Sequence, residues 1–260
     1  MIHFALTAVA LALGAGTAPA AVVTKTVEYE FDGVKLKGYI AYNDGAMDKR
    51  PGVLVVHEWW GLDEYAKGRC KQLAEAGYVA FAPDMYGEGK TTEHPADAKK
   101  MADLTRENVK VWRGRAEAGL KQLKAHPQVD GGKLAAIGYC FGGSTCLQLA
   151  YSGADLKAVV TFHAALPKPT AEEAKAIKPR VLVCHCADDF FITADAIKAF
   201  RAALDDAKTM YAFVSYKDAV HSFTVPGADK HMIKGMKYDK AADEDSWKRT
   251  LALFKDTMGK

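Results

Sequence analysis

The sequence predicts an α/β fold with a mostly parallel sheet, an antiparallel hairpin at its start and helices on both faces. The main observation is that short apolar runs alternate with helical stretches, an order typical of parallel sheets with right-handed crossovers. A second is composition: the 260 residues are 49% hydrophobic and 26% charged, which suits a domain with a sizeable core. No internal repeat or linker interrupts the chain, so we expect a single domain over residues 21–260.

The first part of this domain is predicted to form a hairpin followed by a buried strand. Val22–Phe31 and Val34–Ala41 flank Asp32-Gly33, a hairpin turn signal. Val53–Val56 is apolar throughout, as in strands that are covered on both faces. We therefore expect the parallel part of the sheet to begin with this run.

Helices and strands alternate in the rest of the chain. Asp63 can cap a helix that runs to about Ala76, where Gly77 ends it. Residues 84–95 are polar and contain glycine, so we expect a loop at the carboxyl edge of the sheet. A single long helix is expected next, with a near-helical apolar stripe that we interpret as core packing: Met101, Leu104, Val109, Trp112, Ala116, Leu120 and Leu123. The remaining predicted elements are strands at Tyr78–Ala82, Leu134–Ile137, Leu156–Phe162, Val181–His185 and Tyr211–Tyr216, and helices at Ser144–Tyr151 and about Glu244–Met258.

Cys140 is the candidate nucleophile. The stretch Gly138-Tyr139-Cys140-Phe141-Gly142 stands between a predicted strand and a predicted helix, and this order resembles the nucleophile elbow of α/β-hydrolases. Glycines on both sides remove the clashes of a strained turn, and the N–H groups at a helix start favour a thiolate. The alternative is that Cys140 is a small buried hydrophobic residue.

A thiol nucleophile needs a base, and the base needs an orienting acid. In α/β-hydrolases the chain order is nucleophile, acid and histidine. His221 follows the strand predicted at Tyr211–Tyr216 and is the candidate base. Asp188 or Asp189, after the preceding strand, is the candidate acid; only one of two adjacent side chains can serve, and the residues alone do not separate them. Other histidines at predicted strand ends are expected to line the pocket or form hydrogen bonds: His57, His163 and His185.

The segment after Val53–Val56 supplies further candidates. An oxyanion hole in such folds takes one backbone N–H from the residue after the nucleophile, here Phe141, and another from this earlier segment, where Trp59 is the candidate. Glu58 would point into the same space and could hydrogen-bond the thiol and control its ionisation. Alternatively, Glu58 is the structural partner of an Arg or Lys. Trp59 and Trp60 either line the pocket or only pack.

Together these motifs resemble the dienelactone hydrolase (carboxymethylenebutenolidase) family from about Val22 to the final helix. The markers are His57-Glu58-Trp59-Trp60-Gly61, Pro83-Asp84-Met85-Tyr86-Gly87, Gly138 to Gly143, His185 to Ile192 and Ala219-Val220-His221-Ser222-Phe223. The resemblance implies a monomeric, cofactor-free carboxylic ester hydrolase with a Cys-His-Asp triad, acting on small molecules. It places the acid at Asp189. It also places Glu58 where the family has a glutamate that pairs with the resting thiol and releases it as thiolate when substrate binds.

Two departures from the family pattern bear on the substrate. The resemblance implies two arginines that hold the carboxylate of dienelactone, but the corresponding positions here are Glu88 and Val225. An anionic lactone would lose its bidentate partner and meet repulsion from Glu88. We therefore expect a hydrolase of neutral esters or lactones.

Residues 1–20 predict a secretory signal peptide. Residues 4–15 are almost wholly apolar, and Ala18-Pro19-Ala20 forms a cleavage site before Ala21. The apolar run is too short to span a membrane, and no later segment is more apolar, so we expect a periplasmic or secreted protein. The net charge is +3 with both signs interspersed, so nucleic-acid binding is not indicated.

The five cysteines leave two other classes of function open. An odd number in an exported protein leaves at least one free thiol, so a thiol or redox protein is one alternative. The other is a non-catalytic binding protein on the hydrolase fold. No spacing demands disulfides among the remaining cysteines, which are Cys70, Cys146, Cys184 and Cys186. Cys184-His185-Cys186 lacks the additional ligands that a metal site needs, so we expect no metal.

Overall fold

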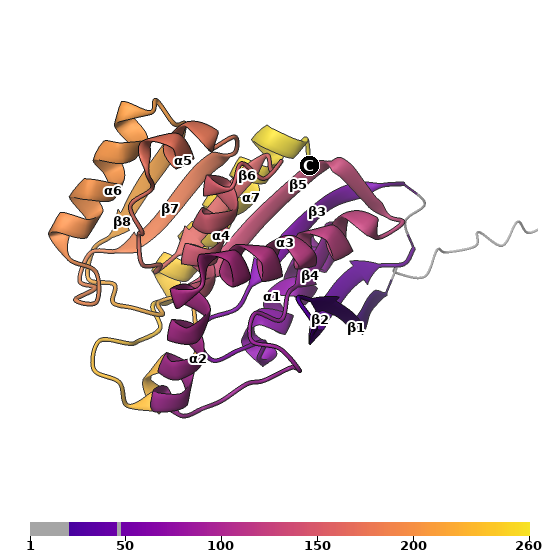
Figure 1. Ribbon diagram of the computed structural model, residues 1–260, viewed down its shortest axis with the longest axis horizontal. Coiled ribbons are helices and arrows are strands. Elements are labelled where there is room, and N and C mark those ends of the chain that lie inside the picture. Colours follow the sequence, from indigo (N-terminus) through magenta and orange to yellow (C-terminus); the bar gives the residue numbers. More distant parts are fainter. Residues whose placement is uncertain (1–20, 46–47) are drawn as a thin grey trace, which may run out of the picture.

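One eight-stranded sheet forms the centre of the computed structural model, which describes residues 21–45 and 48–260 (Figure 1). Along the chain the strands are β1 (Val22–Phe31), β2 (Val34–Asn43), β3 (Arg50–Val56), β4 (Val79–Ala82), β5 (Val129–Tyr139), β6 (Ala158–Phe162), β7 (Arg180–Cys186) and β8 (Tyr211–Tyr216). Their order across the sheet is β1-β2-β4-β3-β5-β6-β7-β8. β2 is antiparallel to both β1 and β4, and the other pairs are parallel. The predicted mostly parallel sheet with an N-terminal hairpin is therefore confirmed, whereas the signal peptide predicted at residues 1–20 lies outside the described residues.

Helices cover both faces of this sheet. They are α1 (Glu64–Glu75), α2 (Pro95–Glu107), α3 (Val109–Ala125), α4 (Phe141–Tyr151), α5 (Ala171–Ala176), α6 (Ala194–Asp206) and α7 (Lys240–Met258). Apolar residues of α1 and α7 pack on one face, and those of α3, α4 and α6 pack on the other. Figure 1 shows α3 and α4 in front of the strands and α7 behind them. Because β3 is covered on both sides, all of Val53–Val56 is buried, as its apolar run predicted.

The ends of α1 also agree with the prediction. The side chain of Asp63 accepts a hydrogen bond from the Ala66 N–H at 3.1 Å and caps the helix start. After the helix, Gly77 takes φ +89°, a left-handed conformation that glycine adopts without strain. No helix in the described part of the chain is both long enough and apolar enough to cross a membrane.

The single long helix predicted around residues 101–123 is wrong, because the chain forms two helices there. Asn108 separates α2 from α3 with φ −112° and ψ 89°, and its side chain accepts a hydrogen bond from the Val111 N–H at 3.1 Å. This cap starts a new helix in the middle of the apolar stripe. Leu104 and Val109, next to the break, are 60% and 45% exposed, so the stripe is not continuous core. The stripe residues that are buried are Trp112, Ala116 and Leu123.

β5 and α7 begin well before their predicted starts, because their first residues are mostly polar. β5 begins at Val129, which pairs with Arg50 of β3, well before the apolar run that marks its second half. α7 begins at Lys240, because the carboxylate of Asp239 accepts a hydrogen bond from the Ala242 N–H at 2.9 Å. Neither start carries the apolar spacing by which elements are recognised in a sequence.

The loop at residues 84–95 is organised by one buried carboxylate. Asp84 accepts hydrogen bonds from the N–H groups of Gly87 and Gly89, each at 2.7 Å. It also accepts one from the N–H of Lys37 on β2 at 3.0 Å. The loop is therefore anchored to the antiparallel part of the sheet.

Candidate active site

Cys140 occupies a strained turn between β5 and α4. Its φ of 51° lies in the left-handed region, which residues with a side chain rarely adopt, and it is the N-cap of α4. Its N–H donates to the carbonyl of Phe162, the last residue of β6, at 3.0 Å. The side chain of Cys140 is half-buried. The local structure is thus the strand, sharp turn and helix of a nucleophile elbow.

The glycines around Cys140 are required by close packing. A Cβ at Gly138 would lie 2.1 Å from the carbonyl oxygen of Gly142, and a Cβ at Gly142 would lie 2.2 Å from that of Val56. A Cβ at Gly143 would lie 2.5 Å from the Cβ of Ala164. These positions therefore admit only glycine without a shift of the backbone.

His221 and Asp189 form a buried pair. His221 Nδ1 lies 2.8 Å from Asp189 Oδ2, and the two residues are 7% and 6% exposed. The other carboxylate oxygen of Asp189 accepts a hydrogen bond from the Phe191 N–H at 2.9 Å. Asp188 is exposed, and its N–H donates to the carbonyl of Ala219. The loop after β7 therefore turns Asp189, and not Asp188, towards the imidazole.

Cys140 and Asp189 act together on the charge of His221. Burial lowers the pKa of His221, but the thiol of Cys140, which is hydrogen-bonded to the ring, and the carboxylate of Asp189 raise this pKa well above its ordinary value. Burial raises the pKa of Asp189, but the hydrogen bond and charge of His221, together with hydrogen bonds from the Phe191 N–H and Cys186, bring this pKa below its ordinary value. A positively charged imidazole next to a thiol stabilises the thiolate. The structure thus brings together three residues that lie far apart in the sequence.

Glu58 is buried beside this group and is 2% exposed. Its Oε1 accepts a hydrogen bond from Ser222 Oγ at 2.9 Å and lies 3.7 Å from His163 Nδ1. Burial raises the pKa of Glu58 to about 7, although the charge of His221 and hydrogen bonds from Ser222 and Trp60 oppose the shift. A carboxyl with this pKa changes its charge near neutral pH, which the constant partner of an Arg or Lys would not do.

The two predicted oxyanion donors follow β5 and β3. Phe141 is the first residue of α4, where N–H groups have no acceptor within the helix. Trp59 follows β3, and its carbonyl accepts a hydrogen bond from the Tyr86 hydroxyl at 3.0 Å. Trp60 is 4% exposed, stacks on His231 with ring centroids 4.0 Å apart and donates a hydrogen bond to Glu58, whereas Trp59 is half-buried.

Further residues join the site. His163 was predicted to line the pocket or form hydrogen bonds, and its ring lies 5.2 Å from that of His221. Ser222 and Tyr86 were not predicted, although each belongs to a motif that carries the family resemblance. Ser222 takes φ 57°, which turns its hydroxyl towards Glu58. The signal that could have found both residues is their position in loops at strand ends.

All five cysteines are free thiols. Cys184 and Cys186 both point into one core layer with Cys70, as their two-residue spacing on a strand predicted. Cys186 Sγ lies 3.6 Å from Asp189 Oδ2. Within residues 21–45 and 48–260, no three His, Cys, Asp or Glu side chains come together in a way that could hold a metal ion.

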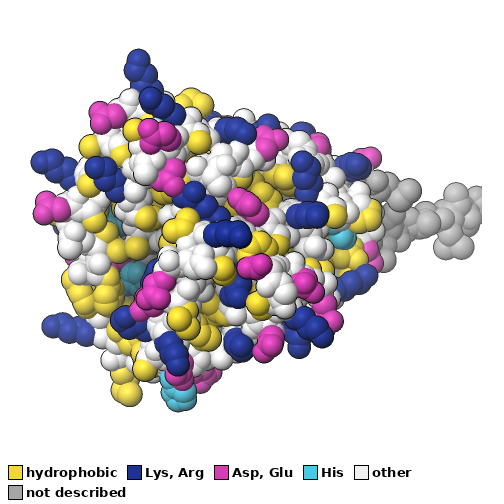
Figure 2. Space-filling model, in the orientation of Figure 1, with side chains coloured by type: hydrophobic (Ala, Val, Ile, Leu, Met, Phe, Trp, Pro, Cys, Tyr) yellow, Lys and Arg dark blue, Asp and Glu magenta, His cyan; other side chains and the backbone are white. Residues whose placement is uncertain are grey.

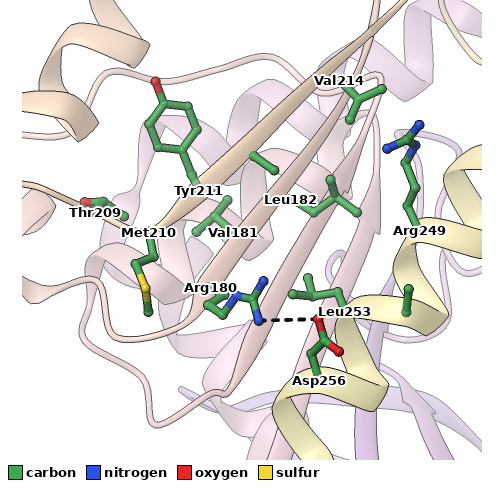
Figure 3. A pocket seen from close by; sticks show the side chains of 12 residues that line it. Arg180, Val181, Leu182, Thr209, Met210, Tyr211, Val214, Arg249, Leu253 and Asp256 are labelled. Atoms are coloured by element: carbon green, nitrogen blue, oxygen red, sulfur yellow. Dashed lines mark ion pairs between the residues drawn. The ribbon is translucent and has the colours of Figure 1, made fainter.

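A groove of about 700 Å³ lies elsewhere, at the amino ends of β7 and β8 against α7 (Figure 3). Leu182, Val214 and Leu253 line it, and Arg180 Nη1 lies 3.7 Å from Asp256 Oδ2 at its edge. None of the predicted site residues lines this groove, because they stand at the opposite ends of the strands. The face shown in Figure 2 carries positive and negative side chains intermingled, as the sequence predicted.

Comparison with known proteins identifies the family. Residues 36–258 match the model of the dienelactone hydrolase family. The chain belongs to this family. Protein usf of Aquifex pyrophilus is 32% identical over 242 residues, which cover 89% of this chain and 98% of that protein.

Solved structures agree with this assignment. A dienelactone hydrolase-like promiscuous phosphotriesterase from metagenomic libraries is 39% identical, with a TM-score of 0.88, over 91% of this chain and 99% of that one. The structure of m3DLH is 37% identical, with a TM-score of 0.89 and the same coverage. The predicted α/β-hydrolase fold is confirmed, and the family indicates a hydrolase that acts on small esters or lactones.

Proposed function

We propose that this protein hydrolyses esters with Cys140 as nucleophile, His221 as base and Asp189 as the acid that orients the base. The observation that carries the proposal is one connected arrangement at the carboxyl ends of parallel strands. Cys140 stands on a strained turn, its thiol is hydrogen-bonded to His221, and His221 Nδ1 lies 2.8 Å from Asp189. Acyl transfer by a covalent intermediate requires these three roles in this order.

The reaction then proceeds through a thioester. The thiolate of Cys140 attacks the ester carbonyl carbon, and the N–H groups of Phe141 and Trp59 stabilise the oxyanion that forms. The imidazolium of His221 gives its proton to the leaving alkoxide, which departs as the alcohol. His221 next takes a proton from water, and the resulting hydroxide attacks the thioester and releases the acid. Each oxyanion donor contributes ~10²–10³ in rate in such sites.

We assign to Glu58 the control of thiol ionisation. A carboxyl whose pKa is about 7 gains or loses its charge in the pH range in which the enzyme operates. In the conformation described here its oxygen is held by Ser222, so pairing with the thiol of Cys140 requires the carboxyl to turn. The proposal therefore gives Glu58 two positions, one beside Ser222 and one beside the thiol.

Neutral esters and lactones are the substrates that this site favours. Glu88, at the first position where dienelactone-cleaving relatives are expected to have arginine, is exposed and lies 3.5 Å from Lys90 Nζ. Val225 stands at the second position and brings no charge. Phe191 is 47% exposed with its ring 5.2 Å from that of His221, and it stacks on Phe190. The surface beside the base is thus apolar rather than cationic.

A second candidate activity is the hydrolysis of phosphotriesters. It is favoured by the 39% identity with a promiscuous phosphotriesterase over nearly the whole chain. A phosphotriester is neutral and also develops an oxyanion when a nucleophile attacks it, so the same donors could serve.

A panel of chromogenic substrates tests both activities. It contains a neutral ester, a thioester, a neutral lactone, dienelactone and a phosphotriester, each assayed with the wild type and with Cys140→Ala. We expect hydrolysis of the neutral ester that is lost in Cys140→Ala. Hydrolysis that persists in the variant would exclude Cys140 as nucleophile, and a strong preference for dienelactone would exclude the neutral substrate class.

Two rival classes predict different outcomes. A redox protein would show Cys140 in a disulfide after isolation, which thiol titration and a disulfide map would detect. A binding protein would bind the same ligands with and without the Cys140 thiol and would hydrolyse none. The free thiols and the buried pair of His221 with Asp189 favour the hydrolase over both.

We further propose that the protein is exported as a monomer, with cleavage after Ala20. The apolar residues 4–15 and the Ala18-Pro19-Ala20 site support export. Expression of the whole chain in a Gram-negative host should give a periplasmic protein whose first residue is Ala21, and its mass in solution should be that of one chain. A cytoplasmic protein with residues 1–20 retained would contradict the proposal.

A further inference from the structure

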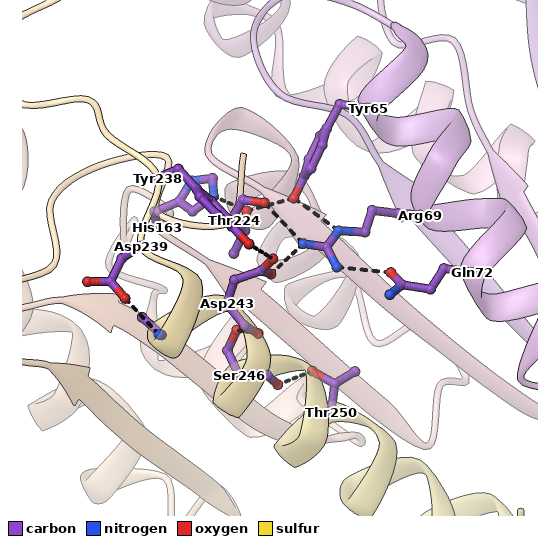
Figure 4. A network of polar contacts seen from close by, with 11 residues as sticks. Tyr65, Arg69, Gln72, His163, Thr224, Tyr238, Asp239, Asp243, Ser246 and Thr250 are labelled. Carbon is purple, nitrogen blue, oxygen red and sulfur yellow. Dashed lines mark hydrogen bonds and ion pairs between the residues drawn. The ribbon is translucent and has the colours of Figure 1, made fainter. Parts of the chain in front are cut away.

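A chain of polar side chains leads from α7 to His163 (Figure 4). Arg69 on α1 is 8% exposed, and its guanidinium contacts the carboxylate of Asp243 at the start of α7. Its Nη2 donates to the carbonyl of Thr224 at 3.1 Å, and its Nε donates to the hydroxyl oxygen of Tyr65 at 3.2 Å. Tyr65 donates in turn to Thr224 Oγ1 at 2.7 Å, and Thr224 Oγ1 lies 2.8 Å from His163 Nε2. The chain ends at His163, whose other ring nitrogen faces Glu58.

Arg69 sets the direction in which the hydrogen bonds of this chain are donated. An arginine Nε can only donate, so the Tyr65 oxygen accepts and the single proton of Tyr65 goes to Thr224 Oγ1. Thr224 is fully buried, and its hydroxyl proton needs an acceptor, which His163 Nε2 provides. A neutral imidazole that accepts at Nε2 carries its proton on Nδ1. The chain therefore makes His163 a donor towards Glu58.

His163 is held in this place at a cost in backbone strain. It is fully buried and takes φ 40°, a value that residues with a side chain rarely adopt. Its Nδ1 lies 3.7 Å from Glu58 Oε1, beyond hydrogen-bond distance, and has no partner in the described part of the chain. A buried N–H directed at a carboxyl but not yet bonded to it is rare in folded proteins.

We propose that His163 is a positioning residue for Glu58. The Arg69-Tyr65-Thr224 chain keeps the proton of the His163 ring on Nδ1. The Glu58 carboxylate accepts a hydrogen bond from this N–H when Glu58 turns away from the thiol. The proposal deepens the proposed function, because it rests on Glu58 having two positions. Ser222 and His163 then hold the carboxylate together, and the thiolate of Cys140 is left to His221. A shift of Glu58 by less than one ångström brings its oxygen within hydrogen-bond distance of Nδ1.

The charged groups around both partners are consistent with this role. Burial first, and then the charges of His221 and Arg69, lower the pKa of His163 well below its ordinary value, so the ring stays neutral. Glu58 is faced by His221, whose charge favours the carboxylate, and by Asp63, whose charge disfavours it. The rings packed on His163 are those of Tyr139, His221 and Phe223. Besides Trp60, whose side chain also donates a hydrogen bond to Glu58, Ser222 and His163 are the neighbours that present an uncharged O–H or N–H to this carboxyl.

Two spectroscopic measurements on the full chain test the proposal without relying on turnover. Nitrogen NMR of histidine-labelled protein reports which ring nitrogen of His163 carries the proton, and we expect Nδ1. Infrared titration follows the Glu58 carboxyl, which is assigned by its loss in Glu58→Gln. In His163→Phe the midpoint of this titration should rise by about one pH unit, a ~10-fold change in proton affinity, because the ionised form loses a donor. Phenylalanine is chosen because it keeps a ring in this place and has no N–H to donate.

A second variant covers the case in which His163→Phe does not fold. Tyr65→Phe removes the hydroxyl that fixes the Thr224 proton, and part of His163 should then carry its proton on Nε2 instead. Tyr211→Phe, which loses hydrogen bonds with Asp205 and Arg201 at an exposed site, is the matched control and should leave His163 unchanged. The proposal is overturned by a proton on Nε2 in the wild type, by an unchanged Glu58 midpoint in His163→Phe, or by an unchanged tautomer in Tyr65→Phe. Absence of ester hydrolysis would reject the proposed function instead, since neither spectrum depends on it.

Discussion

Glu58 Oε1 accepts a hydrogen bond from Ser222 Oγ at 2.9 Å, across 164 positions of sequence. Ser222 directly follows His221, so this bond joins the segment after β3 to the residue that serves as base in the proposed mechanism. The carboxyl assigned to control of the thiol and the imidazole that receives the thiol proton are therefore mechanically coupled. We therefore expect a movement of Glu58 to shift the backbone at His221.

The buried carboxyl of Glu58 predicts a stability that depends on pH. Unfolded Glu58 ionises near 4.5, whereas the folded pKa is about 7, so between these values the native state keeps a proton that the unfolded state has released. The contribution of this group to stability is complete below pH 4.5 and is lost as pH rises to 7, by about 3 kcal/mol. In urea denaturation, the free energy of unfolding of Glu58→Gln should therefore rise relative to that of the wild type as pH increases over this range. Glu75→Gln, at an exposed position, should show no such relative rise, and a pH-independent difference for Glu58→Gln would contradict the shifted pKa.

The two adjacent aspartates should differ sharply in their effect on activity. Asp189→Asn removes the charge that holds the imidazole of His221 and should lower kcat by ~10²–10⁴. Asp188→Asn changes an exposed carboxylate and should leave kcat almost unaltered. Steady-state kinetics on the preferred ester of the panel provides the comparison. Equal losses in the two variants would argue that the loop after β7 matters only as a structure.

Gly138 should tolerate no side chain, in contrast to Gly68. Gly138→Ala places a Cβ 2.1 Å from the Gly142 carbonyl oxygen, and the overpacked turn should cost roughly 1–3 kcal/mol or more in unfolding free energy and remove most of the activity. Gly68 lies within α1 with no atom within 4 Å of the added Cβ, so Gly68→Ala should stabilise the protein by about 0.5–1 kcal/mol. Chemical denaturation of both variants measures whether the free energy of unfolding falls in Gly138→Ala and rises in Gly68→Ala. A Gly138→Ala protein as stable and active as the wild type would disprove the steric role.

The ion pair of Arg69 and Asp243 should stabilise the fold far more than a pair on the surface. Its side chains are 9% and 14% exposed, so Arg69→Gln leaves a buried carboxylate unpaired and should cost about 3–5 kcal/mol. Arg249 and Asp245 pair at 2.5 Å with side chains that are 50% and 41% exposed, and Arg249→Gln should cost about 0.2–1 kcal/mol. Urea midpoints of the two variants measure the contrast. Similar losses would mean that burial adds nothing to the Arg69 pair.

Local patterns in the sequence were sufficient for most of the fold. Val53–Val56 predicts a strand buried on both sides, and Asp32-Gly33 predicts the hairpin. Both elements could be predicted because each signal depends only on residues that are adjacent in the chain. The break at Asn108 was missed because the apolar spacing continues through it, and only the cap geometry reveals two helices. The early start of α7 was missed for a related reason, since its first turn is polar.

The candidate site divides in the same way. Cys140 and His221 stand in short motifs after strands, so the residues alone were enough to predict them as candidates. Asp189 was separated from Asp188 only by resemblance to the family, because the choice depends on how a loop folds, and the structure buries one and exposes the other. The links from Tyr65 to Thr224, 159 positions away, and from Glu58 to Ser222 have no local signature at all.

The segment that carries His221 is attached to α1 and α7 by a small number of polar contacts. Arg69 binds the Thr224 carbonyl and the Asp243 side chain, and the N–H of Asp239 donates to the Phe223 carbonyl at 3.0 Å. Cys140, by contrast, is embedded in the central strands. On mild heating the enzyme should therefore lose its base before its nucleophile: α7 frays, hydrolysis stops, and the thiol still reacts with alkylating reagents in an otherwise folded sheet. Cooling would then restore activity without refolding of the whole domain.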